Sequence, residues 1–378
     1  MSPLFTPFAL RKAQLANRIV VSPMLQHAAR DGVPSKWHLM HYGTLALSGA
    51  GLLIIEGTAV EPRGRCGAQC IGLYSDAAEA AIAGIVAFVR EHADIRLGIQ
   101  LAHAGRKGAA TPTWVPRRRL TAEEGGWQTV GCSPTEDPVF GVPEVLDGRG
   151  IGDIVDAWAG AARRAERAGL DLLELHFAHG YLVHQFLSPL TNQRTDGYGG
   201  SLERRMRFAI DVFRACRDAW PDGKPIGVRV SATDWVPGGW TVEETVELAR
   251  ALQREGCDYI CASSGGASLA QQIVAGPGYQ VAFAERIRTE AGIPTIAVGQ
   301  ITEPRQAEQI VANGQADLVA LARRMLYDPR WPWHAAVELG VDLQYPPRYR
   351  MCHPRMGAKL TLPESREHGE RLARLQTS

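Results

Sequence analysis

Short apolar runs recur along the whole chain, and each run is continuous rather than alternating with polar residues. Such runs are typical of parallel strands that helices cover on their outer side. We predict eight strands, which read RIVVSPM (18–24), GLLIIEG (51–57), LGIQLA (97–102), LLELHFA (172–178), IGVRVS (226–231), YICASSG (259–265), PTIAVG (294–299) and DLVALA (317–322).

The segments between these strands carry apolar residues at helical spacing, most clearly at 74–92, 201–220 and 241–256. Ser75 and Ser201 are suitable N-caps, and Thr241 begins a T-x-x-E capping box. Strands alternating with helices predict a single (β/α)8 TIM barrel. The alternative, a doubly wound open sheet, lacks its G-x-G-x-x-G signature, because the first strand ends in SPM.

A Pro-, Gly- and Trp-rich segment at 103–149 is longer than an ordinary loop. We interpret it as an extended excursion after strand 3 that crosses the barrel mouth, with room for a hairpin of its own. The barrel is expected to occupy residues 1–350, and 351–378 to form a polar C-terminal tail.

Composition excludes some classes of partner. The 41 basic and 40 acidic residues give a net charge of +1, which offers no electrostatic footprint for nucleic acid or an anionic membrane. The chain has no apolar run of about 18 residues and no secretory signal pattern, so we expect a cytoplasmic protein. Two C-x3-C pairs, at 66/70 and 257/261, lack zinc-knuckle spacing, and the cysteines are expected to be reduced and structural.

The carboxyl ends of barrel strands carry the chemistry in this fold. Polar or glycine-rich tips follow all eight predicted strands, which indicates one large ligand filling the mouth. The last three tips combine small residues with an arginine, as a phosphate site requires. The tips are Ser22-Pro23-Met24, Glu56-Gly57-Thr58, Gln100 with His103, His176 with His179, Arg229, Ser263 to Gly266, Gly299-Gln300 and Ala322-Arg323.

Three histidines, His176, His179 and His184, lie within ELHFAHGYLVHQF at 174–186. The pattern alone allows a metal site, a clamp for negative charge on a substrate, or structural packing. Zinc needs several convergent ligands. Apart from Glu56, the matching strand ends carry no acidic or cysteine ligand, so we predict no metal.

The chain resembles the Old Yellow Enzyme family of FMN-dependent ene-reductases from about Leu4 to Arg350, and it is most similar to the bacterial branch called thermophilic-like. The 186–208 run is the most specific, and its role is expected to be bracing of the fourth loop. The motifs are VSPM (21–24), IIEGTAVEPRGR (54–65), QLAHAGRK (100–107), ELHFAHGYL (174–182), FLSPLTNQRTDGYGGSLERRMRF (186–208), GVRVS (227–231) and ARRMLYDP (322–329).

The resemblance implies FMN as cofactor, NADPH or NADH as reductant, and ping-pong reduction of the C=C bond of α,β-unsaturated carbonyl or nitro compounds. It also implies a homo-oligomer, either dimer or tetramer, without nucleic-acid or membrane partners. Arg229 would face N1 and O2 of the flavin, and Gln100 its pyrimidine edge. The other implied FMN contacts are Ser22, Pro23, Met24, Gly57 and His176 around the ring, and Ser264, Gly299, Gln300, Ala322 and Arg323 around the phosphate.

The resemblance also implies catalytic roles. His176 and His179 would bind the carbonyl or nitro oxygen of the substrate while hydride reaches the β-carbon. Tyr181 would protonate the α-carbon. His184 matches no family role and is expected to be structural.

The chain departs from this branch at three positions. Leu25 replaces a cysteine and His27 replaces a tyrosine, and both are expected at the substrate. His27 would either add a titratable group to the pocket or face a neighbouring loop. Ala322 replaces a glycine, which is tolerable if its φ is negative. Because Leu25 and His27 reshape the pocket, a dedicated reductase of an enoyl or aryl thioester is an alternative function.

Two further questions stay open. A lyase or isomerase without flavin is disfavoured, because no lysine ends a strand where a Schiff base would need it and because Arg229 and Gln100 fit a flavin. Within PPRYR (346–350), Arg348 or Arg350 either reaches a neighbouring subunit's site or belongs to a solvent-facing tail.

Overall fold

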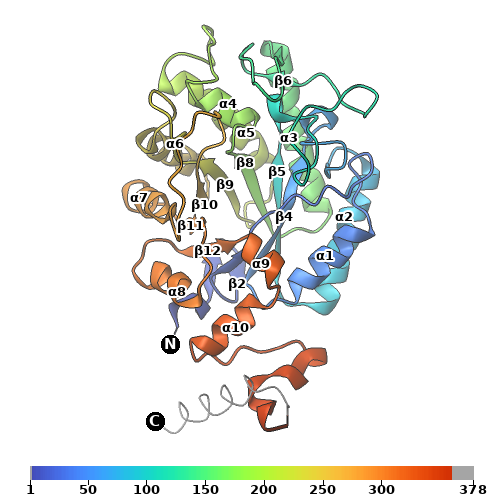
Figure 1. The fold of residues 1–378 in the computed structure, drawn as a ribbon, viewed down its shortest axis with the longest axis vertical. Helices are drawn as coiled ribbons and strands as arrows, with labels where there is room; N and C mark the ends of the chain where they lie inside the picture. The colour runs from blue at the N-terminus through green and yellow to red at the C-terminus, as the bar shows by residue number, and fades with distance from the viewer. Residues whose placement is uncertain (1, 360–378) are drawn as a thin grey trace.

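Eight parallel strands close into a barrel in the computed structural model, which describes residues 2–359 (Figure 1). Hydrogen bonds join the strands in the order β3-β4-β5-β8-β9-β10-β11-β12, and β12 pairs with β3 to complete the circle. Each predicted strand is present, so the (β/α)8 prediction is confirmed. The strands are β3 (Ile19–Val21), β4 (Leu52–Ala59), β5 (Arg96–Ala102), β8 (Leu172–Phe177), β9 (Ile226–Ser231), β10 (Tyr259–Ser263), β11 (Thr295–Ala297) and β12 (Leu318–Leu321).

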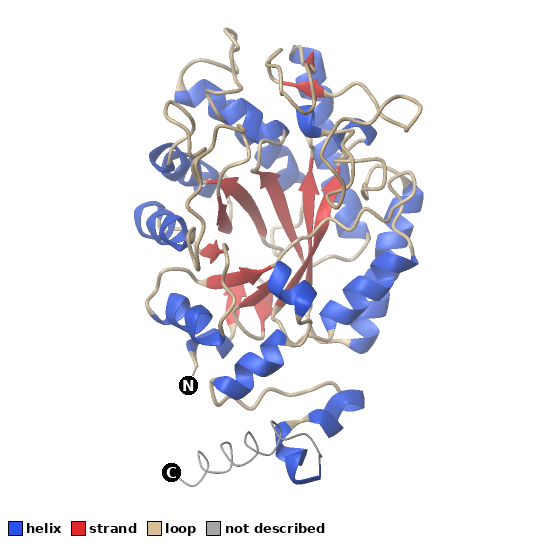
Figure 2. Ribbon diagram, viewed as in Figure 1, coloured by secondary structure: helices blue, strands red, loops and turns tan. Residues whose placement is uncertain are grey.

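Helices surround the barrel, and Figure 2 shows them outside the strands. Ser75, Ser201 and Thr241 are the N-caps of α2, α5 and α6, as predicted, and Glu244 completes the capping box of α6. The helices are α1 (Lys36–Ala46), α2 (Asp76–His92), α3 (Gly148–Arg167), α4 (Leu182–Leu187), α5 (Leu202–Ala219), α6 (Val242–Arg254), α7 (Val281–Ala291), α8 (Pro304–Ala312), α9 (Arg323–Tyr327) and α10 (Trp331–Glu338).

A short antiparallel hairpin, β1 (Phe8–Leu10) with β2 (Ala13–Leu15), precedes the barrel and was not predicted. Its Leu10 and Leu15 are buried in one apolar cluster with Val20, Leu52 and Tyr259. These three residues lie on barrel strands, so the hairpin packs against the barrel's amino-terminal end. A larger cluster joins the strands to the surrounding helices.

The excursion after β5 lies at the end of the barrel toward which the arrowheads of β5 and β8 point (Figures 1 and 2). It contains the short helix η3 (Gly105–Lys107) and two short strands, β6 (Val130–Gly131) and β7 (Glu144–Val145). β6 and β7 run parallel and do not form a hairpin, but antiparallel bridges join Ala110 to Arg119 and Asp137 to Gly141 within the excursion. Parallel pairing needs a crossover, and residues 132–143 supply it.

The run at 186–208 braces this region, as expected. The Asn192 side-chain amide donates to the carbonyls of Phe186 at 2.6 Å and Tyr198 at 2.8 Å. Arg194 Nη1 donates to the carbonyls of Cys132 at 2.9 Å and Leu146 at 2.7 Å. The loop after β8 is thereby fixed to the excursion.

The chain ends its described part with two short helices, η4 (Pro347–Cys352) and η5 (Pro354–Lys359). The predicted boundary at 350/351 falls inside η4, and the rest of the predicted tail, 360–378, lies outside the described residues. Two more short helices are η1 (Pro3–Phe5) and η2 (Pro62–Gly64). Within the described residues, no helix is long and apolar enough to cross a membrane.

The hairpin's contribution to stability can be tested with Leu15→Ala. Leu15 is 1% exposed, so truncation should lower the free energy of unfolding by about 2–5 kcal/mol through lost burial and a residual cavity. Leu269→Ala is the matched control, because Leu269 is 69% exposed and should change stability by less than about 0.5 kcal/mol. Equal effects of both substitutions in chemical denaturation would contradict the packing role.

Candidate active site

The end of β8 brings three predicted catalytic side chains together. His176 Nε2 lies 3.3 Å from His179 Nδ1, and His179 Nε2 lies 2.7 Å from Ser263 Oγ at the end of β10. The Tyr181 ring meets the His176 ring edge-on, with centroids 4.8 Å apart. His176 is buried, whereas His179 and Tyr181 are partly buried. The pair and the tyrosine therefore form one cluster at the barrel mouth.

The backbone at His179 is held in the left-handed region, with φ +61°. Its N–H donates to Ser231 Oγ at 2.9 Å, and its carbonyl accepts from Lys107 Nζ at 2.9 Å. A Cβ added at Gly266 would lie 2.5 Å from His179 Cα, so only glycine fits there. These contacts fix the direction of the His179 ring, since a strained residue persists where its surroundings determine it.

Burial lowers the pKa of both His176 and His179 well below 6.5. Arg229 adds to the effect, because β8 and β9 pair His176 directly with Arg229 and a nearby positive charge disfavours imidazolium. Both histidines are therefore neutral at pH 7.

Arg229 and Gln100 face the interior from β9 and β5. Arg229 Nη1 donates to Ser22 Oγ at 3.0 Å, while its Nε is buried without a hydrogen-bond partner among residues 2–359. Gln100 Nε2 donates to Glu174 Oε1 at 2.7 Å, and burial raises the pKa of the Glu174 carboxyl. A Cβ at Gly57 would meet Gln100 Oε1 at 3.4 Å, so the backbone of β4 lies beside this amide.

Pro23, Met24 and Leu25 follow Ser22 directly and are partly buried. Leu25 also lies beside Gly57, since a Cβ at Gly57 would meet Leu25 Cδ2 at 3.5 Å. The predicted residues of β3, β4, β5 and β9 thus occupy neighbouring positions around the mouth.

The predicted phosphate residues follow β10, β11 and β12. Ser264 Oγ donates to Gln280 Oε1 at 2.6 Å, and a Cβ at Gly299 would approach Gln280 Nε2 to 2.8 Å. Gly299 has φ +114°, which favours glycine, and Gln300 has φ +50°. Ala322 has φ −109°, so the expectation that alanine is tolerated here because φ is negative is confirmed. Arg323 begins α9 and is exposed.

Leu25 and Tyr181 pack against a small cluster of Cys66, Cys70 and Ala104. Cys66 Sγ donates to Tyr181 Oη at 3.0 Å, and Cys70 Sγ lies 3.5 Å from Nδ1 of His27. Both thiols are free, as expected, and they contact the predicted site residues Tyr181 and His27.

His27 is buried, and burial lowers its pKa below 6.5. Its ring meets Trp114 of the excursion edge-on, with centroids 5.5 Å apart. His27 contacts Cys70 and not Tyr181, so the two thiols lie between His27 and Tyr181.

His184 does not join the other two histidines. It is buried in α4, where its Nδ1 accepts from the N–H of Gly180 at 2.9 Å and its Nε2 lies 3.0 Å from Asp234 Oδ1. The Glu56 carboxylate accepts hydrogen bonds from Tyr42 Oη at 2.9 Å and from the N–H of Gln26 at 2.9 Å. In the described part of the chain, no group of three acidic, histidine or cysteine side chains could hold a metal ion.

Ser263 was predicted as a strand tip, but its contact with His179 and several other contacts within the site were not predicted, because they join segments far apart in the chain. Ser231, Ser263 and Lys107 hold His179, Glu174 holds Gln100, and Gln280 holds Ser264. Arg348 and Arg350 are exposed in η4, and entry of either into a neighbouring site stays a prediction.

Comparison with known proteins agrees with this geometry. A profile of the "NADH:flavin oxidoreductase / NADH oxidase family" matches residues 3–341. The chain is 43% identical over 348 residues to an NADPH dehydrogenase of Geobacillus thermodenitrificans, covering 92% of this chain and 97% of the relative. It is 38% identical over 360 residues to an NADH:flavin oxidoreductase of Gibberella zeae, covering 90% and 87% of the two chains.

Solved structures show the same architecture. Morphinone reductase superposes with a TM-score of 0.75 at 29% identity, covering 91% of each chain. A 2-naphthoyl-CoA reductase superposes with a TM-score of 0.80 at 23% identity, covering 90% of this chain and 52% of the other, and shows likeness of fold alone. The predicted family is confirmed: the chain belongs to the NADH:flavin oxidoreductase / NADH oxidase family, the Old Yellow Enzymes, and is an FMN-dependent NAD(P)H oxidoreductase.

Proposed function

We propose that this oxidoreductase reduces the C=C bond of activated alkenes, namely α,β-unsaturated carbonyl compounds and nitroalkenes. The observation that carries the proposal is the neutral pair His176–His179, which lies beside Tyr181 and opposite Arg229. Two imidazoles that donate to one oxygen and a phenol beside them fit an alkene conjugated to a carbonyl or nitro group.

The residues at the mouth fit FMN. Arg229 offers a buried Nε without a partner in the described range, and a guanidinium suits the negative charge of a reduced flavin. Gln100 would bind the pyrimidine edge, and Ser22, Pro23, Met24 and Gly57 would line the ring. Ser264, Gly299, Gln300, Ala322 and Arg323 would hold the phosphate. FMN, when bound, accepts hydride from NADPH or NADH and passes hydride to the β-carbon of the alkene.

His176 and His179 bind the substrate oxygen in this proposal. Nδ1 of His176 is buried without a partner among residues 2–359, so it is free to donate. Nε2 of His179 can donate to the substrate in place of its bond to Ser263 Oγ once the contact between His179 Nδ1 and His176 Nε2 is given up, because a neutral imidazole carries one N–H. Donors held in place by the protein are most effective where negative charge develops in a water-poor site.

Tyr181 gives its proton to the α-carbon. Burial raises the pKa of this phenol well above 10.0, so it is a weak acid, but a carbon with enolate character is a sufficient base for it. Since the nicotinamide amide and the alkene would use the same two histidines, the reductant must leave before the alkene binds. Use of the same pair, His176 and His179, by both the reductant and the alkene supports ping-pong kinetics, in which the two bind at the barrel mouth one after the other.

The neutral state of His176 and His179 predicts how the free energy of unfolding depends on pH. A histidine with a depressed pKa in the folded state binds fewer protons than in the unfolded state below pH 6.5, so it lowers stability as pH falls from 6.5 toward the folded pKa. Between pH 6.5 and about pH 5, each histidine should cost about 1 kcal/mol or more. Unfolding titrations of wild type and His176→Gln/His179→Gln should show the smaller pH slope in the variant. An unchanged slope in the double variant would contradict burial as the cause.

Tyr181→Phe separates the proposed acid from the rest of the site. Anaerobic flavin reduction by NADPH should survive, whereas reoxidation by cyclohexenone should slow by about 10² or more, because proton transfer by a positioned acid contributes this much. Stopped-flow absorbance measures both half-reactions. Equal loss of both would refute the assignment, and a parallel scan with enoyl and aryl thioesters tests the alternative substrate class.

Arg229→Gln tests the flavin contact. Loss of a charged partner should weaken FMN binding about tenfold or more, since charge-assisted hydrogen bonds are the stronger ones. FMN released on dialysis, followed by fluorescence, gives the dissociation constant. Arg254→Gln, at an exposed position of α6, is the control, and equal FMN retention by the two variants would exclude Arg229 from the site.

A further inference from the structure

Three side chains around Tyr181 have no part in the mechanism so far. Cys66 donates to the Tyr181 hydroxyl at 3.0 Å, although the two residues are 115 positions apart. Cys66 packs against Cys70, whose thiol lies 3.5 Å from His27 Nδ1. The four side chains thus form a row of contacts in the order Tyr181, Cys66, Cys70, His27, in which the two thiols pack together and each contacts a polar side chain at its end of the row.

Burial argues that this row is built rather than incidental. Cys66 and Cys70 are 4% and 1% exposed, and His27 is 4% exposed. Cys66 therefore has little water to bond with, and its S–H is directed at the oxygen that the proposed mechanism deprotonates. A thiol differs from a hydroxyl as a neighbour of this phenol in two ways. It is a weaker hydrogen-bond donor than a hydroxyl, and it is a stronger acid than the phenol itself.

Cys66 is a stronger acid than Tyr181, to which it donates its hydrogen bond. A hydrogen bond from Cys70 lowers the pKa of the Cys66 thiol below 9.0. Burial, together with the neighbouring Cys66, raises the pKa of Tyr181 well above 10.0. Once Tyr181 has lost its proton, transfer from Cys66 Sγ to Tyr181 Oη is therefore downhill.

We propose that Cys66 is a positioning residue and proton reserve for Tyr181, an inference that rests on the proposed role of Tyr181 as the acid. As the Tyr181 O–H bond breaks to form the α-carbon C–H bond, the Cys66 S–H bond breaks and the O–H bond forms again. Only protons move, and no oxidant or reductant is needed. The step leaves a Cys66 thiolate that accepts a hydrogen bond from Cys70.

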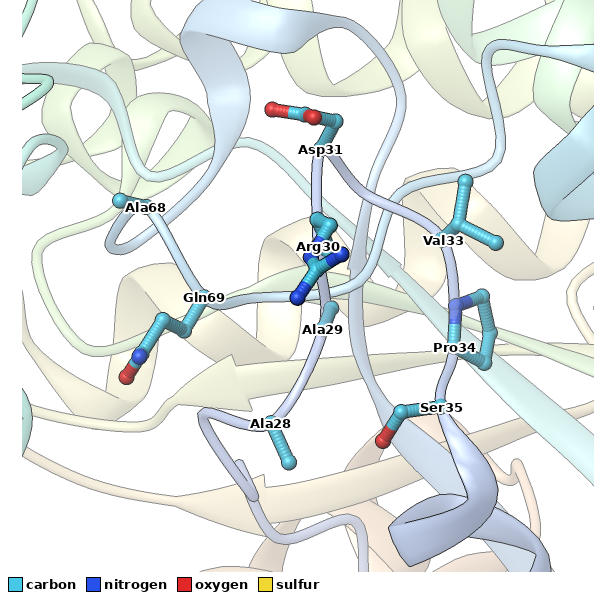
Figure 3. A pocket seen from close by; sticks show the side chains of 9 residues that line it. All are labelled: Ala28, Ala29, Arg30, Asp31, Val33, Pro34, Ser35, Ala68 and Gln69. Carbon is cyan, nitrogen blue, oxygen red and sulfur yellow. The ribbon is translucent and has the colours of Figure 1, made fainter.

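The proton returns from solvent before the next turnover. His27 and Cys70 flank the segments 28–35 and 68–69, which line a hollow of about 800 Å³ (Figure 3). Arg30, Asp31 and Gln69 in this lining are exposed, so the hollow opens to water. The proposal therefore assigns the return of the proton to this side, where Ala28 and Gln69 in the lining are the chain neighbours of His27 and Cys70.

The thiol's charge environment determines where its pH effect appears. Besides its partners in the row, three charged groups act on Cys66 or are acted on by it. These groups are Glu56, Lys107 and Arg117. Above the pKa of Cys66 the reserve is empty before the reaction begins, so the rate of α-carbon protonation should fall on the alkaline side.

The experiment compares Cys66→Ala and Cys66→Ser in the flavin-loaded enzyme. Cys66→Ala should leave anaerobic reduction by NADPH unchanged and slow reoxidation by cyclohexenone about tenfold, the loss of one hydrogen bond of ordinary strength. Cys66→Ser should recover most of the rate at pH 7, because a hydroxyl also donates. In the wild type, the reoxidation rate should fall at alkaline pH as the Cys66 thiol loses its proton. In both variants this fall should begin at a higher pH, because the thiol is absent. Cys216→Ala, a buried thiol on α5, controls for general effects of thiol removal.

Tyr181→Phe and Tyr181→Phe/Cys66→Ala distinguish this inference from the proposed function. If the reserve acts through Tyr181, the double variant is no slower than Tyr181→Phe alone. If Tyr181→Phe slows reoxidation while Cys66→Ala keeps the wild-type rate and its alkaline fall, the reserve is refuted and the acid stands. Equal slowing by Cys66→Ala and Cys66→Ser, with the alkaline fall unmoved, would show packing alone and also refute it. Full turnover by Tyr181→Phe would overturn both.

Discussion

The pairing of β8 with β9 places His176 directly opposite Arg229, and the chemistry of the mouth depends on this register. Burial, together with the fixed guanidinium beside the imidazole, disfavours a positive charge on His176, so the proposed clamp stays neutral and Arg229 is the one permanent charge available to a flavin. A slip of one residue would turn both side chains away from the mouth. Barrel closure prevents such a slip, because every strand has two hydrogen-bonded neighbours.

The clamp and the acid are set by different kinds of restraint. His179 is held by a left-handed backbone and by Gly266, which leaves no space for another residue. Tyr181 is held by softer contacts, with the His176 ring on one side and the Cys66 thiol on another. The part of the site proposed to bind the substrate oxygen is thus tightly restrained, whereas the proposed proton donor lies near groups that differ from the usual pattern of this branch, including Leu25 and His27.

Much of the barrel could be predicted from the sequence, since unbroken apolar runs such as GLLIIEG at 51–57 are long enough to identify buried strands. The hairpin of β1 and β2 could not, because its strands are three residues each and expose one residue in each. Residues at strand ends, such as Gln100 and Arg229, were visible as polar interruptions of apolar runs. Their partners were not: Ser263 meets His179 from 84 positions away, and Cys66 meets Tyr181 from 115. Local patterns carry no information about which loop folds over which strand end.

The hairpin at the barrel's amino-terminal end has a practical consequence. Figure 1 shows the N-terminus at the lower end of the molecule, away from the excursion and the loops around the mouth. The first residues are fixed to α8 through Glu308, which accepts from Ser2 Oγ at 2.6 Å and from the N–H of Leu4 at 3.0 Å. A surface tether joined through a linker to this end would therefore orient an immobilised layer of the enzyme with every mouth toward the solution, and reagents would reach it without crossing the support.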